Sequence, residues 1–123
     1  MERLRKRADF LRMMKGRKWV TPGLILQSLE QPAILAGDVR CGITVSRKVG
    51  GAVERNRARR RLRALANDVL AKKARSHHDY VLIGRVNTLT RSWELLGRDL
   101  ETALAHIHGE RQKSKTHTGK NAE

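Results

Sequence analysis

Residues 43–63 read ITVSRKVGGAVERNRARRRLR, and the change of pattern within this stretch decides the fold. Its first residues complete an alternating segment, residues 39–47, that predicts a strand with one face on the core. Gly50 and Gly51 then interrupt the chain, and a helical pattern follows. The apolar positions of the strand are Val39, Cys41, Ile43 and Val45, and the opposite face carries Arg40, Gly42, Thr44 and Ser46.

A long helix is predicted for residues 52–73. At 100° per residue its apolar side chains form a single stripe, and its arginines spread over the other side. The helix can therefore dock its apolar side on a sheet and present its basic side outward. The stripe is Ala58, Leu62, Leu65, Ala66 and Val69, and the basic side is Asn56, Arg57, Arg59, Arg60 and Arg63.

Five further elements are predicted on either side of this pair. They are a helix over residues 10–15 with Asp9 as its cap and Phe10, Met13 and Met14 on one face, strands over 24–29, 33–36 and 80–86, and a helix from Trp93 to Ile107 capped by Ser92. The order α-β-β-β-α-β-α favours one α+β domain over residues 1–108, a two-layer α/β sandwich with helices on a small mixed sheet. Residues 109–123 are polar, and we expect a disordered tail there.

The charge of the chain predicts a polyanionic partner. Among 123 residues there are 27 Lys and Arg against 12 Asp and Glu, a net charge of +15. Residues 1–18 and 47–63 each hold eight basic side chains, and six arginines fall within residues 55–63. Such a density repels itself unless anions screen it, and nucleic acid is the first candidate.

Other composition features narrow the class of protein. A single cysteine, Cys41, excludes an intramolecular disulfide and fits a reducing cytoplasm, and its place on the apolar face predicts a buried, inert thiol. Aromatic residues make up only 3% of the chain, so the core is expected to be aliphatic. No apolar run approaches the roughly 20 residues of a membrane span, and the N-terminus lacks the apolar segment of a secretory signal.

No catalytic or metal site of the protein itself is predicted, and no small-molecule substrate. The aspartates are isolated, and the chain has no phosphate-binding glycine motif. His77 and His78 point apart as neighbours in the chain, and His106 and His108 diverge on a helix.

The central stretch closely resembles the signature of the bacterial ribonuclease P protein component. That family has a strand ending in Ser-[Lys/Arg]-Lys, a Gly-x-Ala-Val turn and a helix opening with Arg-Asn-Arg. The resemblance extends to Asp9–Phe10, to Asp79–Ile83 and to Trp93–Ile107. The matching positions of the signature are Ser46, Arg47, Lys48, Gly50, Ala52, Val53, Arg55, Asn56, Arg57, Arg60 and Arg63.

The resemblance implies a function and a fold. The family's ribonucleoprotein is an endoribonuclease that removes the 5′ leader of precursor tRNA, and its RNA subunit carries the active site and the Mg²⁺ ions. Its fold has the left-handed β-α-β crossover of a ribosomal-protein domain. By resemblance, the RNA subunit would contact Arg47, Lys48, Arg55, Asn56, Arg57, Arg59, Arg60 and Arg63, and the leader would lie in a cleft formed by Phe10, Met14, Arg40, Thr44 and Ser46.

Several alternatives stay open at the level of sequence. Asn56 is either an RNA contact or a helix cap, and Phe10 either stacks on a base or belongs to the core. Met14 stands where family members often carry a second aromatic residue. A structural RNA-binding protein of ribosomal type has the same charge and fold. A DNA-binding or membrane-surface role is disfavoured, because the core uses the apolar stripe of the long helix and no helix-turn-helix pattern precedes it.

Overall fold

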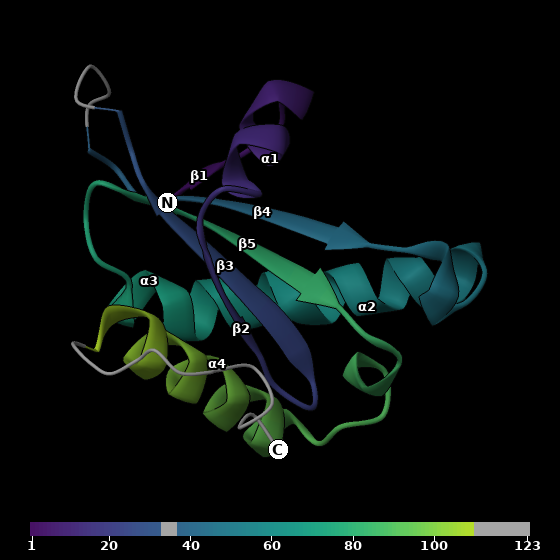
Figure 1. The fold of residues 1–123 in the computed structure, drawn as a ribbon. Coiled ribbons are helices and arrows are strands. Elements are labelled where there is room, and N and C mark those ends of the chain that lie inside the picture. Colours follow the sequence, from purple (N-terminus) through teal and green to yellow (C-terminus); the bar gives the residue numbers. More distant parts are fainter. Residues whose placement is uncertain (33–36, 110–123) are drawn as a thin grey trace.

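The computed structural model describes residues 1–32 and 37–109 of the chain (Figure 1). It contains a five-stranded mixed sheet with the strand order β1-β4-β5-β3-β2. The strands are β1 Glu2–Arg3, β2 Arg17–Val20, β3 Leu24–Glu30, β4 Arg40–Val45 and β5 His78–Gly84, and the helices are α1 Arg7–Met13, α2 Ala52–Leu65, α3 Ala71–Lys73 and α4 Trp93–His108.

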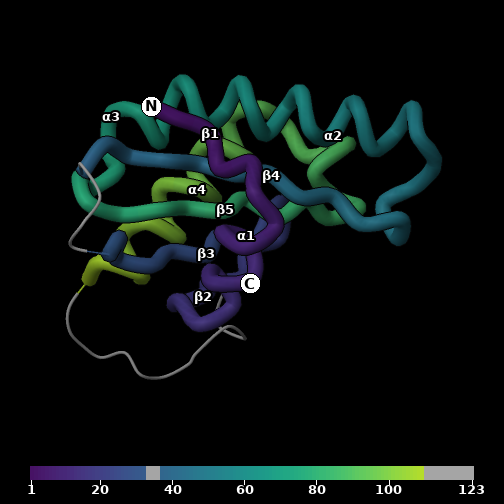
Figure 2. The backbone as a smooth tube through the Cα atoms, turned by 90° about the horizontal axis from the view of Figure 1, so that it is seen from above, coloured from purple at the N-terminus to yellow at the C-terminus, as the bar shows by residue number. Residues whose placement is uncertain are grey.

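Strands β4 and β5 are parallel neighbours, and α2 connects them. A π-helical turn, Ala66–Leu70, joins α2 to α3, so the predicted helix over residues 52–73 is present with one irregular turn. Figures 1 and 2 show α2 running alongside β4 and β5. The crossover that the sequence predicted is thus present, and its left-handed sense stays a prediction.

The main core lies between the sheet and the helices α2 and α4, which cover the same face (Figure 1). The stripe of α2 predicted from the sequence is buried there as expected. The opposite face is covered in part by α1, where Met13 packs with Leu4 and Val81. Strand β5 is therefore enclosed from both sides, which explains its nearly continuous apolar sequence. The predicted α+β class with helices on a small mixed sheet is confirmed.

Two strands of the sheet were not predicted. Strand β1 has two exposed residues and no apolar alternation. It is a strand only through backbone hydrogen bonds, such as that from Glu2 N–H to Val39 C=O at 2.9 Å. Strand β2 pairs antiparallel with β3 across a turn in which the Thr21 hydroxyl donates to Leu24 C=O at 2.6 Å. With α2 and α3 taken as one interrupted helix, the element order is therefore β-α-β-β-β-α-β-α over the described residues. The predicted strand at 33–36 and the tail residues 110–123 lie outside them.

One local prediction was wrong, one open alternative is excluded and one prediction is confirmed. Helix α1 begins after Lys6, so Asp9 lies within its first turn and does not cap it. Asn56 is not a cap either, because α2 begins after Gly51, whose N–H donates to the Glu54 carboxylate at 3.0 Å. Trp93, the first residue of α4, is 43% exposed. Ser92 caps α4 as predicted, with its hydroxyl accepting from a backbone N–H in the first turn.

Candidate nucleic-acid interface

The basic side of α2 faces away from the core. Ala58, Leu62 and Leu65 are buried on the sheet, and the remaining positions of the helix turn outward. We call the outward set the α2 arginine face. It comprises Arg55, Asn56, Arg57, Arg59, Arg60 and Arg63, of which Asn56, Arg57 and Arg60 are exposed and the other three half-buried.

The turn between β4 and α2 brings two more predicted contacts to the start of this helix. Ser46 Oγ accepts from the backbone N–H of Lys48 at 3.3 Å, and Arg47 and Lys48 are both exposed. Gly50 has φ +152°, and a Cβ there would lie 2.7 Å from the Cβ of Glu54. Glycine is therefore required at this position for the helix to start where it does. The turn thus places two further exposed cations just before α2 in the chain.

Contacts within α2 distinguish its arginines. Arg59 Nη1 donates to Asn56 Oδ1 at 3.1 Å, so Asn56 orients a neighbouring guanidinium. Arg61 points elsewhere and donates to the carbonyl groups of Leu89 and Arg91 at 3.1 and 2.5 Å. Its guanidinium carbon also lies 6.0 Å from the Trp93 ring centroid. Arg61 therefore fastens α2 to the segment before α4, and it was not among the predicted contacts.

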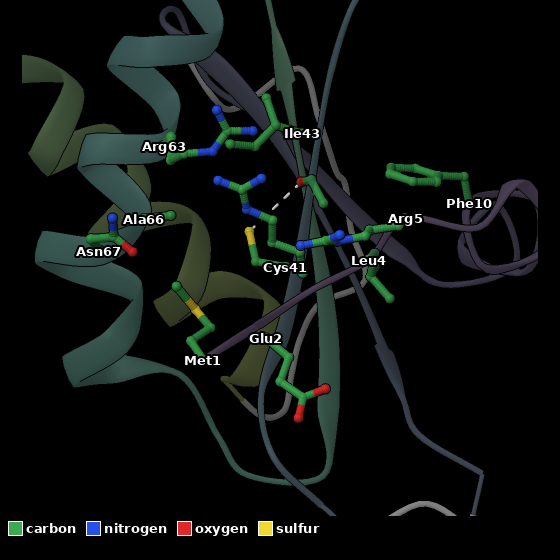
Figure 3. Close-up of a pocket in the computed structure, with 12 residues that line it drawn as sticks. Met1, Glu2, Leu4, Arg5, Phe10, Cys41, Ile43, Arg63, Ala66 and Asn67 are labelled. Atoms are coloured by element: carbon green, nitrogen blue, oxygen red, sulfur yellow. Dashed lines mark hydrogen bonds between the residues drawn. The ribbon is translucent and has the colours of Figure 1, made fainter.

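A cleft of about 450 Å³ adjoins the α2 arginine face (Figure 3). Figure 3 shows Phe10 of α1 on one side of it and Arg63 and Asn67 on the other. Its lining combines cations with apolar surface, which suits an anionic chain that also carries flat bases. The lining residues are Met1, Glu2, Arg3, Leu4, Arg5, Phe10, Cys41, Gly42, Ile43, Arg63, Ala66 and Asn67.

Phe10 reaches this cleft because β4 has no side chain where the ring lies. A Cβ on Gly42 would be 2.6 Å from the Phe10 ring, so the ring packs directly on the strand backbone. Phe10 is half-buried at the edge of the small core with Met13, and it also lines the cleft. The core interpretation of Phe10 therefore describes its position, and stacking on a base stays a prediction for the part of the ring that lines the cleft.

The other predicted cleft residues are spread more widely. Arg40 and Thr44 share with Gly42 the face of β4 that α1 covers, as the alternation of β4 predicted. Ser46 lines a separate hollow of about 440 Å³ with Lys48 and residues of β3 and β5. Met14 is 71% exposed and is not among the residues lining either hollow.

Met14 does not pack on the sheet as Phe10 and Met13 do, and its predicted contact with the leader stays a prediction. Helix α1 ends at Met13, and Met14 is its exposed C-cap residue. Sequence reasoning also missed Gly42, Arg5 and Asn67 as cleft residues. Arg5 was visible within the basic N-terminal window, and Gly42 shares its predicted strand face with Arg40 and Thr44, but nothing local marked Asn67.

Arg40 is held by a buried carboxylate. Its Nε and Nη2 donate to the two oxygens of Asp79 at 2.9 and 2.6 Å. Arg12 of α1 also pairs with Asp79, and Gln31 Nε2 donates to it at 2.9 Å. Burial alone would raise the pKa of Asp79, but the hydrogen bonds from Arg40 and Gln31 and the charge of Arg12 hold it below its ordinary value. The network ties α1 to β4 and β5 beside the cleft.

The family profile described as Ribonuclease P matches residues 1–108. The chain belongs to the ribonuclease P protein family. Membership makes the protein a bacterial-type ribonuclease P protein component, with RNA binding and tRNA processing as the family's work. The profile match therefore favours a ribonuclease P protein over the alternative of a structural RNA-binding protein of ribosomal type.

Curated relatives and solved structures of the family agree with this assignment. The chain is 49% identical over 110 residues to the ribonuclease P protein component of Paramagnetospirillum magneticum, covering 87% of this chain and 83% of that protein. It is 44% identical to that of Caulobacter vibrioides, covering 94% and 76%. The ribonuclease P protein of Staphylococcus aureus superposes with a TM-score of 0.70 at 27% identity, covering 89% and 99%. That of Thermotoga maritima gives 0.72 at 25%, covering 89% and 100%.

Two further observations concern the described residues alone. None of their helices has the length and hydropathy to cross a membrane. Within residues 1–32 and 37–109, no group of three or more His, Cys, Asp and Glu side chains is placed to hold a metal ion.

Proposed function

We propose that this protein binds the catalytic RNA subunit of ribonuclease P and helps it remove the 5′ leader of precursor tRNA. The observation that carries the proposal is the α2 arginine face: none of its side chains is buried, and the helix has its apolar stripe fully occupied by the core. Family membership supplies the kind of nucleic acid.

The RNA subunit would bind along the α2 arginine face and the two cations of the preceding turn. Arginine suits this task because its planar guanidinium donates two parallel hydrogen bonds to one phosphate. Each neutralised phosphate releases counterions, so the affinity is expected to fall steeply with salt. Asn56 would act through Arg59, whose guanidinium it orients.

The leader would pass through the cleft between Phe10 and Arg63. The exposed part of the Phe10 ring offers a stacking surface, and Arg3, Arg5 and Arg63 offer charge to the backbone. Arg40 would contribute mainly by holding α1 in place, since its guanidinium is occupied by Asp79. Thr44 and Ser46 would contact the leader farther along β4, and Met14 would touch it only outside the cleft.

We also propose that the bond cleavage and the Mg²⁺ ions belong to the RNA subunit. The protein contributes affinity and position, and no step of the chemistry is assigned to its side chains.

The main test removes two charges from the α2 arginine face. The double variant Arg57→Ala/Arg60→Ala should fold normally, because both side chains are exposed, and should bind the RNA subunit at least tenfold more weakly at low salt. Filter binding measures the affinity, and circular dichroism checks the fold.

The matched control removes two exposed charges elsewhere, in Lys72→Ala/Arg98→Ala. It has the same net charge as the test variant, so a specific face predicts nearly wild-type affinity for it. Equal losses in both double variants would mean that net charge alone drives binding, and the proposed interface would then be wrong.

The leader arm uses Phe10→Leu, which keeps an apolar side chain on Gly42 but removes the flat ring. Loss of one stacked base costs about 1–3 kcal/mol, so the holoenzyme should bind precursor tRNA on the order of tenfold more weakly. Mature tRNA, which has no leader, should bind unchanged. An equal effect on both tRNAs would contradict the leader assignment.

A further inference from the structure

A second basic cluster lies at the far end of the sheet from the start of α2. The antiparallel pairing puts Arg17 of β2 opposite Ser28 of β3 and Ser28 opposite Tyr80 of β5. The next row pairs Glu30 with His78. These positions share the face that α4 covers, and the C-terminal end of α4 lies over them. In Figure 1 this end of α4, the start of β5 and α3 are on the left, and the start of α2 is on the right.

Hydrogen bonds and ring contacts make the cluster rigid. The Tyr80 hydroxyl lies 2.7 Å from His108 Nε2 and accepts from the backbone N–H of Arg75 at 2.9 Å. Arg75 Nη2 donates to the His108 carbonyl oxygen at 3.0 Å. The His78 and His108 ring centroids are 5.0 Å apart in an edge-to-face arrangement.

These side chains surround a hollow of about 250 Å³. Two guanidinium groups and two imidazoles face it, against the single carboxylate of Glu30. Neither Arg17 nor Arg75 has an ion-pair partner among the residues that the structure describes. The complete lining is Arg17, Ser28, Leu29, Glu30, Arg75, His78, Ile107 and His108.

The side chains around the hollow carry more positive than negative charge. Burial, together with the nearby Arg75, His78 and Arg17, lowers the pKa of His108 to about 4. An anion in the hollow would relieve this repulsion, whereas Glu30 alone leaves an excess of cations. Around this hollow, the guanidinium groups of Arg17 and Arg75 thus outnumber the single carboxylate of Glu30.

We propose that this hollow binds a backbone phosphate of the ribonuclease P RNA, as a second anchor separate from the α2 arginine face. The inference rests on the proposed function and deepens it. Arg55 and Arg75 are twenty residues apart along a largely helical segment, which at 1.5 Å per residue is about 30 Å. One folded RNA with phosphates along its surface can meet both places, and two separated anchors would fix the orientation of the protein on it.

Arg17 distinguishes this site from a purely structural cluster. Arg75 also satisfies a carbonyl group at the end of α4, so its loss would disturb the helix end. Arg17 is exposed, and its guanidinium makes no hydrogen bond or ion pair within the described part of the chain. A binding role therefore predicts an effect of Arg17→Gln on RNA affinity without an effect on folding.

The experiment measures the affinity of the full-length protein for the RNA subunit as a function of salt. Arg17→Gln should weaken binding severalfold and reduce the slope of log K against log salt by about one, as expected for one lost phosphate contact. Arg98→Gln, on the exposed face of α4, is the matched control and should keep the wild-type slope. Equal slopes for the two variants would overturn the inference.

A second measurement follows the ring signals of His78 and His108 by NMR in histidine-labelled protein. Addition of the RNA subunit should shift both signals and raise the pKa of His108, and inorganic phosphate serves as the comparison probe. Shifts with RNA support the site, whereas no shift with RNA, or shifts with inorganic phosphate only, would overturn it. Failure of the proposed function is distinguishable, because Arg57→Ala/Arg60→Ala would then leave RNA affinity unchanged.

Discussion

Asp79 accepts hydrogen bonds from three side chains that come from distant parts of the chain: Arg12, Gln31 and Arg40. Its own side chain is completely buried. The buried Asp79 carboxylate is balanced by the guanidinium groups of Arg12 and Arg40. Removing one of these partners would leave an uncompensated charge and destabilise the fold. The sequence showed Asp79 as an isolated aspartate, and its importance comes from which residues the fold brings to it.

Replacing Asp79 by Asn should therefore destabilise the fold. Breaking a buried ion pair costs about 3–5 kcal/mol, and the loss would appear as a lower urea midpoint at pH 7. Asp38→Asn, at an exposed position, is the control and should stay within about 0.5 kcal/mol of the parent protein.

The same carboxylate predicts a pH dependence. Because the pKa of Asp79 is lower in the folded state, its contribution to stability is fully present well above its ordinary pKa. The contribution declines as the pH falls below that value and is lost once the pH has passed the lower pKa of the folded state. The parent protein should lose more free energy of unfolding between pH 5 and pH 3 than Asp79→Asn, as followed by denaturant titrations. Parallel curves would show that Asp79 is not linked to folding.

Cys41 gives a further prediction at this scale. It is 7% exposed beneath the cleft, and burial, only partly offset by Arg63, raises the pKa of its thiol to about 12. Since the thiolate is the reactive form, the native protein should react with a maleimide at pH 8 far more slowly than the protein unfolded in guanidinium. Equal rates in the two states would contradict the buried, inert thiol expected from the alternation of β4.

Among the elements, α1 depends on a missing side chain. Its Phe10 ring packs on the backbone of β4 at Gly42, where an added Cβ would lie 2.6 Å from the ring. Gly42→Ala should push the ring and α1 outward, cost about 1–3 kcal/mol and weaken binding of precursor tRNA. Thermal unfolding and holoenzyme assays measure the two effects.

Gly97→Ala in α4 is the matched control for this substitution. A Cβ there would meet no described atom within 4 Å, and alanine in a helix is favoured over glycine by about 0.5–1 kcal/mol. The same chemical change is thus expected to stabilise α4 and to destabilise the contact between α1 and β4. Destabilisation by both would indicate that helix α4 packs more closely than the structure describes.

At the scale of the whole molecule, the net charge of +15 on 123 residues links stability to the partner. Bound RNA stabilises the folded state by RT ln(1 + [RNA]/Kd), about 2.7 kcal/mol at a hundredfold excess over Kd. The melting temperature should therefore rise on the order of 10 °C with the RNA subunit at low salt. The increase should vanish at about 1 M salt, where charges are screened. A salt-independent increase would argue against phosphate contacts.

The sequence by itself determined the elements that carry their own pattern. Strand β4, the helix starting at Ala52, strand β5 and α4 were predicted because apolar periodicity and glycine breaks are local properties of the chain. The same reasoning identified the α2 arginine face, since a docked stripe leaves only one side of a helix for charge. It did not find β1 or β2, which exist through backbone pairing with strands far away in the sequence.

Only the tertiary structure decided what lies beside what. Three contacts each join residues from separate elements. They are the packing of Phe10 on Gly42, the three donors to Asp79, and the cluster of Arg17, Arg75, His78 and His108. It also left Met14 exposed just beyond the end of α1 and outside the lining of the cleft. Periodicity specifies which way a side chain faces within its own element, but strand pairing and helix packing choose its neighbours, and those neighbours set charge and binding geometry.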